Sequence, residues 1–149
     1  RGASMETFGF RLIESADLPA RDKFDNARDY QAAVLEAALE NGAMWEDFRI
    51  RDSELRAHLR NLGTLTGLGA KLVELVRKTP PPSAPKAIEG FSYIDLKEIA
   101  SVLNALTNLT PATLEAIEAE EDLAAVYHLL VGVLEEALRR ELHIAVVEL

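Results

Sequence analysis

The chain has 149 residues, of which 48% are hydrophobic and 6% aromatic, a composition typical of one helix-rich globular domain. Its net charge of −9 argues against binding to nucleic acid or to an anionic membrane surface, because contacts with phosphate need a basic surface. The chain has no cysteine, which excludes a disulfide framework and a thiolate nucleophile and is consistent with a cytoplasmic location.

The N-terminal residues Arg1-Gly2-Ala3-Ser4 resemble what remains of a cleaved tag and linker. We therefore interpret residues 1–4 as a cloning remnant and Met5 as the native start. No apolar run approaches the roughly 18 residues of a membrane span, and no signal peptide is recognisable. Residues 5–149 are predicted to form a single helical domain.

The predicted elements begin with a segment that permits a short strand, because Phe8, Phe10 and Leu12 alternate with Gly9 and Arg11. Helix-capping residues and apolar periodicity then predict five to six helices. They cover residues 26–40, 53–62 and 64–78, a segment after Ser92 that carries Leu96 to Leu106, a segment from Thr110-Pro111, and a long segment from about Glu120 into the low 140s. Trp45, Phe48 and Ile50 are interpreted as a short apolar anchor between the first two helices.

The predicted fold class is therefore all-α, a helical bundle in two groups with at most one short N-terminal strand. The first group spans residues 26–78 and the second spans residues 91–149. Between them, the segment TPPPSAP contains four prolines, which predicts a stiff, extended connector over residues 79–90.

The long C-terminal helix is the most informative feature for function. Its apolar stripe is nearly unbroken, and further apolar residues lie outside that stripe, whereas one small bundle normally covers a single stripe. We therefore expect a second copy, another protein or the folded-back N-terminal segment to cover the rest, and a homodimer is the favoured form. The predicted interface consists of Tyr127, Leu129, Leu130, Val131, Leu134, Leu138, Leu142 and Ile144.

A group of four arginines supports an alternative function. Arg49, Arg51, Arg56 and Arg60 could form an anion-binding patch in a nucleic-acid-linked accessory protein. The same side chains can instead be a solvated face whose charge is balanced by Glu46, Asp47, Asp52 and Glu54, and we favour this structural interpretation.

The second half of the chain is acidic, because residues 98–149 hold ten Asp and Glu but only two Lys and Arg. An acidic surface is predicted from Glu115, Glu118, Glu120, Glu121 and Asp122. Part of this run has a local role, since carboxylates at the start of a helix interact favourably with its positive end. The functional interpretation of the remaining carboxylates is that they bind a basic partner, or that the protein is an inhibitor that mimics nucleic acid.

The sequence offers no catalytic or metal-binding constellation. His58, His128 and His143 are the only histidines, and no two have the four-residue spacing that brings two ligands to one helix face. No GxSxG motif and no phosphate-binding loop with its lysine occur. We therefore predict no metal, no cofactor and no enzymatic activity, and the leading interpretation is a helical interaction, assembly or regulatory module.

Residues Leu59–Gly69, LRNLGTLTGLG, resemble the RNLG-x-hydroxyl turn of TROVE-type RNA-binding domains, the Ro-protein family. This resemblance implies a ring of α-helical repeats that binds small structured RNA. It covers eleven residues, and the fold prediction does not depend on it.

Overall fold

Four β-strands make the fold a mixture of helices and sheet. The computed structural model describes residues 6–75, 91–94 and 96–148. Within them β1 (Glu6–Ile13), β2 (Ala43–Ile50), β3 (Phe91–Ile94) and β4 (His143–Glu148) form one antiparallel sheet with the strand order β2-β1-β4-β3. The prediction of an all-α bundle is therefore wrong, although the strand that the sequence permitted near Phe8 is present as β1.

The largest error concerns β4, which was predicted to continue the last helix. That helix ends at Arg140, and Glu141 takes a left-handed conformation with φ 54°. The chain then reverses and β4 pairs with β1 from Phe8↔Glu148 to Ile13↔His143. A strand buried on both faces is apolar throughout, and such a run cannot be distinguished from a buried helix by its periodicity.

Six α-helices occur in the described residues, together with two 3₁₀ turns at Ser15–Asp17 and Arg21–Lys23. The α-helices are α1 (Ala27–Asn41), α2 (Asp52–Thr66), α3 (Lys71–Leu75), α4 (Leu96–Thr107), α5 (Pro111–Glu118) and α6 (Glu121–Arg140). Two predicted helix starts are confirmed: Asn26 accepts a hydrogen bond from the Asp29 N–H at 2.9 Å, and Thr110 accepts one from the Thr113 N–H at 3.2 Å.

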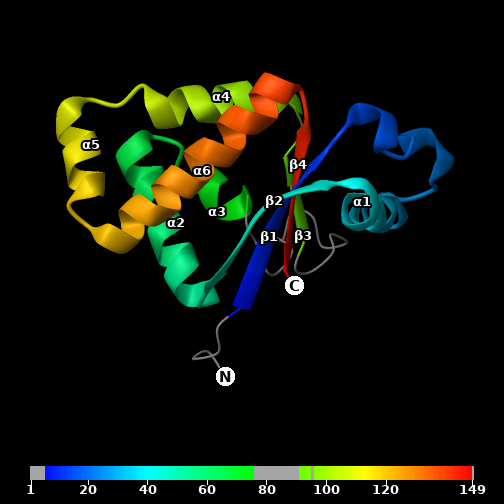
Figure 1. The fold of residues 1–149 in the computed structure, drawn as a ribbon, viewed down its shortest axis with the longest axis horizontal. Helices are drawn as coiled ribbons and strands as arrows, with labels where there is room; N and C mark the ends of the chain where they lie inside the picture. The colour runs from blue at the N-terminus through cyan, green and yellow to red at the C-terminus, as the bar shows by residue number, and fades with distance from the viewer. Residues whose placement is uncertain (1–5, 76–90, 95, 149) are drawn as a thin grey trace.

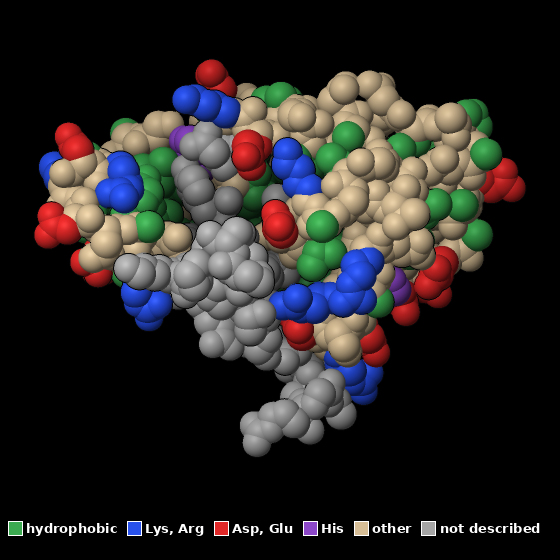
Figure 2. All heavy atoms as spheres, turned by 180° about the vertical axis from the view of Figure 1, so that it is seen from behind, with side chains coloured by type: hydrophobic (Ala, Val, Ile, Leu, Met, Phe, Trp, Pro, Cys, Tyr) green, Lys and Arg blue, Asp and Glu red, His purple; other side chains and the backbone are tan. Residues whose placement is uncertain are grey.

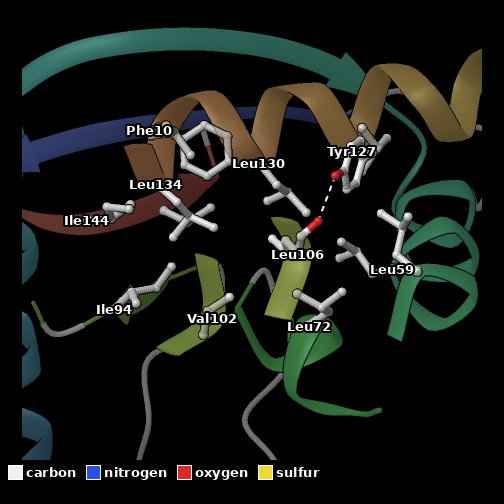
Figure 3. Close-up of a cluster of buried hydrophobic side chains, with 14 of the residues drawn as sticks. Phe10, Leu59, Leu72, Ile94, Val102, Leu106, Tyr127, Leu130, Leu134 and Ile144 are labelled. Carbon is white, nitrogen blue, oxygen red and sulfur yellow. Dashed lines mark hydrogen bonds between the residues drawn. The ribbon is translucent and has the colours of Figure 1, made fainter. Parts of the chain in front are cut away.

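The helices lie on both faces of the sheet, as Figure 1 shows. Helix α1 packs on one face, where Ile13, Val34 and Val147 belong to a small apolar cluster. The other face meets the larger core, to which α2, α3, α4, α5 and α6 all contribute. Leu59 and Leu106, from the two predicted helix groups, lie in that same core (Figure 3). The proposed connector, residues 79–90, and the proposed cloning remnant lie outside the described residues.

A buried hydrogen bond fixes two helices of the large core. The Tyr127 hydroxyl on α6 donates to the Leu106 carbonyl oxygen at the end of α4, at 2.7 Å (Figure 3). Burial raises the pKa of Tyr127, and the negative charges of Glu118 and Glu135 raise it further.

We expect Tyr127→Phe to lower the free energy of unfolding by about 1–3 kcal/mol, because the Leu106 carbonyl loses its buried partner. In the wild type, Tyr127 ionises at a lower pH in the unfolded chain than in the folded protein. Its full contribution to the free energy of unfolding is therefore present below about pH 10 and is lost as the pH rises further. Tyr127→Phe should weaken this alkaline loss. Urea unfolding at neutral and alkaline pH measures both effects, with Tyr30→Phe as the control. If Tyr127→Phe and Tyr30→Phe had the same free energy of unfolding, the prediction would be contradicted.

Candidate interaction surface

Most of the predicted helix interface lies inside the protein. Among the described residues, five of its eight side chains belong to the large core and are less than a tenth exposed: Tyr127, Leu130, Leu134, Leu142 and Ile144. Ile144 is also not on a helix, since it belongs to β4. The apolar excess that predicted an external partner therefore comes largely from packing within the chain. Leu129 and Val131 are half-buried against the same core, and only Leu138 is exposed, at 39%.

An unpaired sheet edge offers a different interaction surface. Strand β2 pairs with β1 on one side, and the strand order gives it no neighbour on the other. Within the described part of the chain, no hydrogen bond to the outer backbone groups of β2 is found. Natural sheets protect such edges with charged residues, Pro, bulges or very short strands. Strand β2, AMWEDFRI, is eight residues long and has no Pro, although it carries charged residues such as Asp47 and Arg49 and a register shift against β1.

Two large apolar side chains are exposed on this edge strand, Met44 at 67% and Trp45 at 38%. Trp45 lies beside α6: its Cζ2 atom is 3.7 Å from the position that a Cβ atom would take at Gly132. Met44 pairs with Arg11 of β1 and so lies on the opposite face of the sheet from Trp45. Exposed apolar groups commonly mark contact sites between proteins, and here Trp45 joins the edge of β2 to α6 on one face.

A cleft of about 610 Å³ adjoins the same strand, between β2, α2 and the first half of α6. Its apolar lining comes from Phe48, Ile50, Ala125, Val126 and Leu129, and its polar lining from Arg49, Glu54, His58, Asp122 and His128. Three consecutive residues of β2 border it, so the cleft runs along the strand. Its size is within the usual range for binding sites.

The four arginines do not act as one free basic patch. Arg51 contacts Glu54 at 2.8 Å, and Arg56 contacts Asp52 at 2.9 Å. Arg49 and Arg60 are exposed and have no ion pair within the described residues. Figure 2 shows basic and acidic side chains interspersed over one face of the molecule.

The predicted acidic residues lie where α5 meets α6, and all five are exposed: Glu115, Glu118, Glu120, Glu121 and Asp122. Glu121 and Asp122 are in the first turn of α6, where a negative charge is favourable. Glu118 contacts His128 Nε2 at 3.0 Å. Local interactions thus involve three of these five carboxylates.

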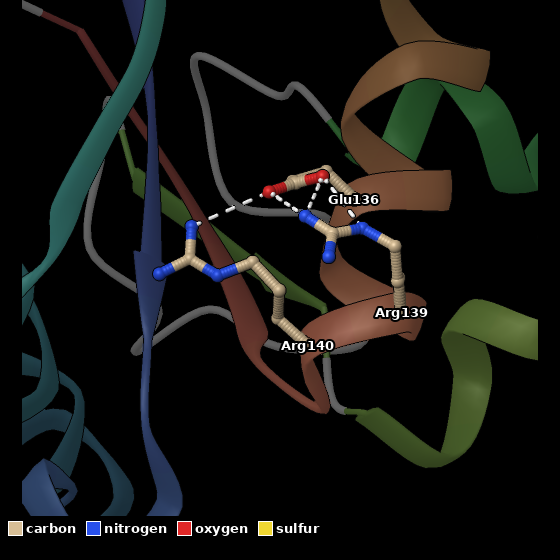
Figure 4. A network of polar contacts seen from close by, with 3 residues as sticks. All are labelled: Glu136, Arg139 and Arg140. Atoms are coloured by element: carbon tan, nitrogen blue, oxygen red, sulfur yellow. Dashed lines mark hydrogen bonds and ion pairs between the residues drawn. The ribbon is translucent and has the colours of Figure 1, made fainter.

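The end of α6 is held by a charged cluster, drawn in Figure 4. Glu136 contacts Arg139 at 2.6 Å and Arg140 at 3.5 Å. Hydrogen bonding and the nearby positive charge of Arg139 hold the pKa of Glu136 below its ordinary value. The contribution of these contacts to the free energy of unfolding is therefore present at neutral pH and is lost as the pH falls through the acidic range. One carboxylate thus contacts both arginines and offsets one of their two positive charges.

The three histidines lie in two different environments. His58 and His128 line the cleft, whereas His143 is buried. His143 Nδ1 accepts a hydrogen bond from the Leu96 N–H at 3.0 Å, so Nε2 carries the proton that is donated to Ser15 Oγ, at 2.7 Å. His143 therefore joins β4 to the start of α4. No group of three or more potential metal ligands occurs in the described residues.

Comparisons with protein-family models, with curated proteins and with solved structures find no match to this chain. Within the described residues, none of the helices is long and apolar enough to cross a membrane. Sequence reasoning did not single out Met44, and it interpreted Trp45 as part of a short apolar anchor. The signal that could have identified them is the absence of Lys and Pro from a strand-length segment.

Proposed function

We propose that this chain is a non-enzymatic protein-interaction module that binds a partner strand along the outer edge of β2. The observation that carries the proposal is the unpaired edge of β2 with its exposed Met44 and Trp45. An added strand would satisfy the free N–H and C=O groups of β2, which is a recurring mode of peptide recognition.

The cleft supports the same proposal, because strand addition obtains affinity from main-chain hydrogen bonds and specificity from pockets for alternate side chains. A strand beside β2 would lie at the mouth of the cleft, whose apolar lining includes Phe48 and Leu129. Its side chains on the α6 side would meet Trp45, and those on the opposite face would meet Met44. A cysteine-free chain suits a reducing compartment, and we therefore place this interaction in the cytoplasm.

A displayed library of extended peptides tests the proposal. We expect peptides selected on the wild-type protein to bind Trp45→Lys at least about 10-fold more weakly, because a lysine on an edge strand disfavours strand addition and the indole contact is lost. Isothermal titration calorimetry with the selected peptides measures this change.

Leu39→Lys is the matched control, since Leu39 is an exposed leucine, 53% accessible, on α1 at the other face of the sheet. Its peptide affinity should equal that of the wild type. Selected peptides that bind both variants equally well would show that β2 is not the binding edge.

A further inference from the structure

We infer that the strand that pairs with β2 is the β2 of a second copy of this chain, aligned antiparallel about a two-fold axis at Phe48. This inference rests on the proposed function, because it needs the outer edge of β2 to accept a strand. It pairs residues 46–50 of the two copies, so Met44 and Trp45 flank the paired segment. The resulting dimer would contain one continuous eight-stranded sheet made from the two four-stranded sheets.

Symmetry restricts the alignment to a few choices. A closed dimer uses the same patch on both copies. In an antiparallel pair related by a two-fold axis, one residue lies opposite itself, and residues at equal distances on either side lie opposite each other on the same face. The candidates near the middle of β2 are Trp45, Glu46, Asp47 and Phe48.

Charge distinguishes these candidates. An axis at Glu46 or at Asp47 places two identical carboxylates directly opposite each other, which is destabilising. An axis at Trp45 places Asp47 opposite Ala43 and leaves the charge of Arg49 beyond the paired segment. An axis at Phe48 places Asp47 of each copy opposite Arg49 of the other, so that two ion pairs form.

The surroundings of these residues fit that alignment. Asp47 and Arg49 alternate with Phe48, so their side chains leave the strand on the face opposite to the large core, although Arg49 also borders the cleft. Arg49 is exposed and forms no ion pair within the described residues. Asp47 contacts Arg11 at 3.0 Å, yet its side chain remains 37% exposed. A carboxylate has lone pairs for a second guanidinium, so Arg49 of the other copy can bind without displacing Arg11.

The aromatic residues favour the same axis. The Phe48 ring lies 5.7 Å from both the Phe8 and the Phe10 ring centroids, which gives a row of aromatic rings across β1 and β2. Opposed aromatic residues are stabilising cross-strand pairs. A second Phe48 at the axis would extend this row across the interface, beside the mouth of each cleft.

Charge reversal with rescue tests the inference by light scattering coupled to gel filtration, over a concentration series at low salt. We expect the wild type at twice the chain mass of 16.4 kDa. Arg49→Glu faces Asp47, and Asp47→Lys faces Arg49, so each variant alone should raise the dimer dissociation constant at least about 10-fold. An equimolar mixture of the two should restore the dimer, since every facing pair is then of opposite charge.

Arg60→Glu is the matched control, because Arg60 is another exposed arginine without an ion pair in the described residues but lies on α2. It should remain a dimer, and circular dichroism should show all variants folded. A monomeric wild type, a dimeric Arg49→Glu or a mixture without rescue would overturn the inference. A monomer whose peptide binding depends on Trp45 would overturn only the second copy as partner, whereas loss of that dependence would overturn the proposed function itself.

Discussion

Leu134→Glu should unfold the protein at neutral pH. Leu134 is 1% exposed in the large core, on the side of α6 that packs against the sheet and α4 (Figure 3). The substitution removes a buried apolar side chain, which costs about 2–5 kcal/mol, and adds a carboxylate without a partner, which costs several kcal/mol more. The sum is comparable with the total stability of a small domain.

Leu138→Glu is the matched control, one helical turn further along α6 and 39% exposed. Its free energy of unfolding should stay within about 0.5 kcal/mol of the wild type, as is usual for surface positions. Circular dichroism and urea unfolding of both variants measure the difference. A folded Leu134→Glu would mean that this face of α6 is not core.

Gly63→Ala is expected to destabilise the protein although it replaces glycine by the best helix former. A methyl group at Gly63 would overlap the carbonyl oxygen of Gly69, whose N–H donates to the Gly63 carbonyl oxygen at 2.9 Å. Ala gains roughly 1 kcal/mol in helix propensity, but forcing the turn away from the helix costs about 1–3 kcal/mol or more. We expect the steric cost to exceed the gain in propensity.

Gly132→Ala separates the two effects. Gly132 is also within a helix, but among the described residues its added methyl group would approach only Trp45, at an ordinary contact distance of 3.7 Å. It should therefore raise the free energy of unfolding by up to about 1 kcal/mol. Thermal unfolding of the two variants measures the opposite signs. If Gly63→Ala were also stabilising, Gly63 could not lie against the Gly69 carbonyl as described.

The sequence predicted two helices, over residues 53–62 and 64–78, which are divided at Gly63. In the structure Gly63 is buried inside α2, which continues to Thr66, and α3 covers Lys71–Leu75. The stop is Gly67, with φ 82°, and Gly69 also has a positive φ, 60°. Each glycine in the segment that resembles an RNA-binding turn thus has a local structural reason.

The helices could be predicted because their signals are local. Asn26 and Thr110-Pro111 begin helices by hydrogen bonds to residues three positions away, and such signals are independent of the rest of the chain. The strands depend instead on distant partners. In β2 the pairing register shifts between Gly9 and Arg11 of β1, so the apolar residues of AMWEDFRI do not alternate regularly.

The candidate site was missed for a related reason. The sequence shows an apolar stripe on α6, but it does not show whether such a stripe faces a core or a partner. Leu130 and Leu134 face the core. The exposed edge of β2 could be recognised only after β1 and β4 had been placed, because an edge is a property of the whole sheet.

The order of the strands also has a consequence for synthesis of the chain. The two central strands, β1 and β4, are the first and the last strands of the described residues. During translation β1 leaves the ribosome early and must wait for His143–Glu148, while β3 has only β4 as a neighbour. Such long-range pairing slows folding and leaves apolar strands exposed in the interval. The nascent chain can therefore form helices progressively, but the sheet closes only after β4 has emerged.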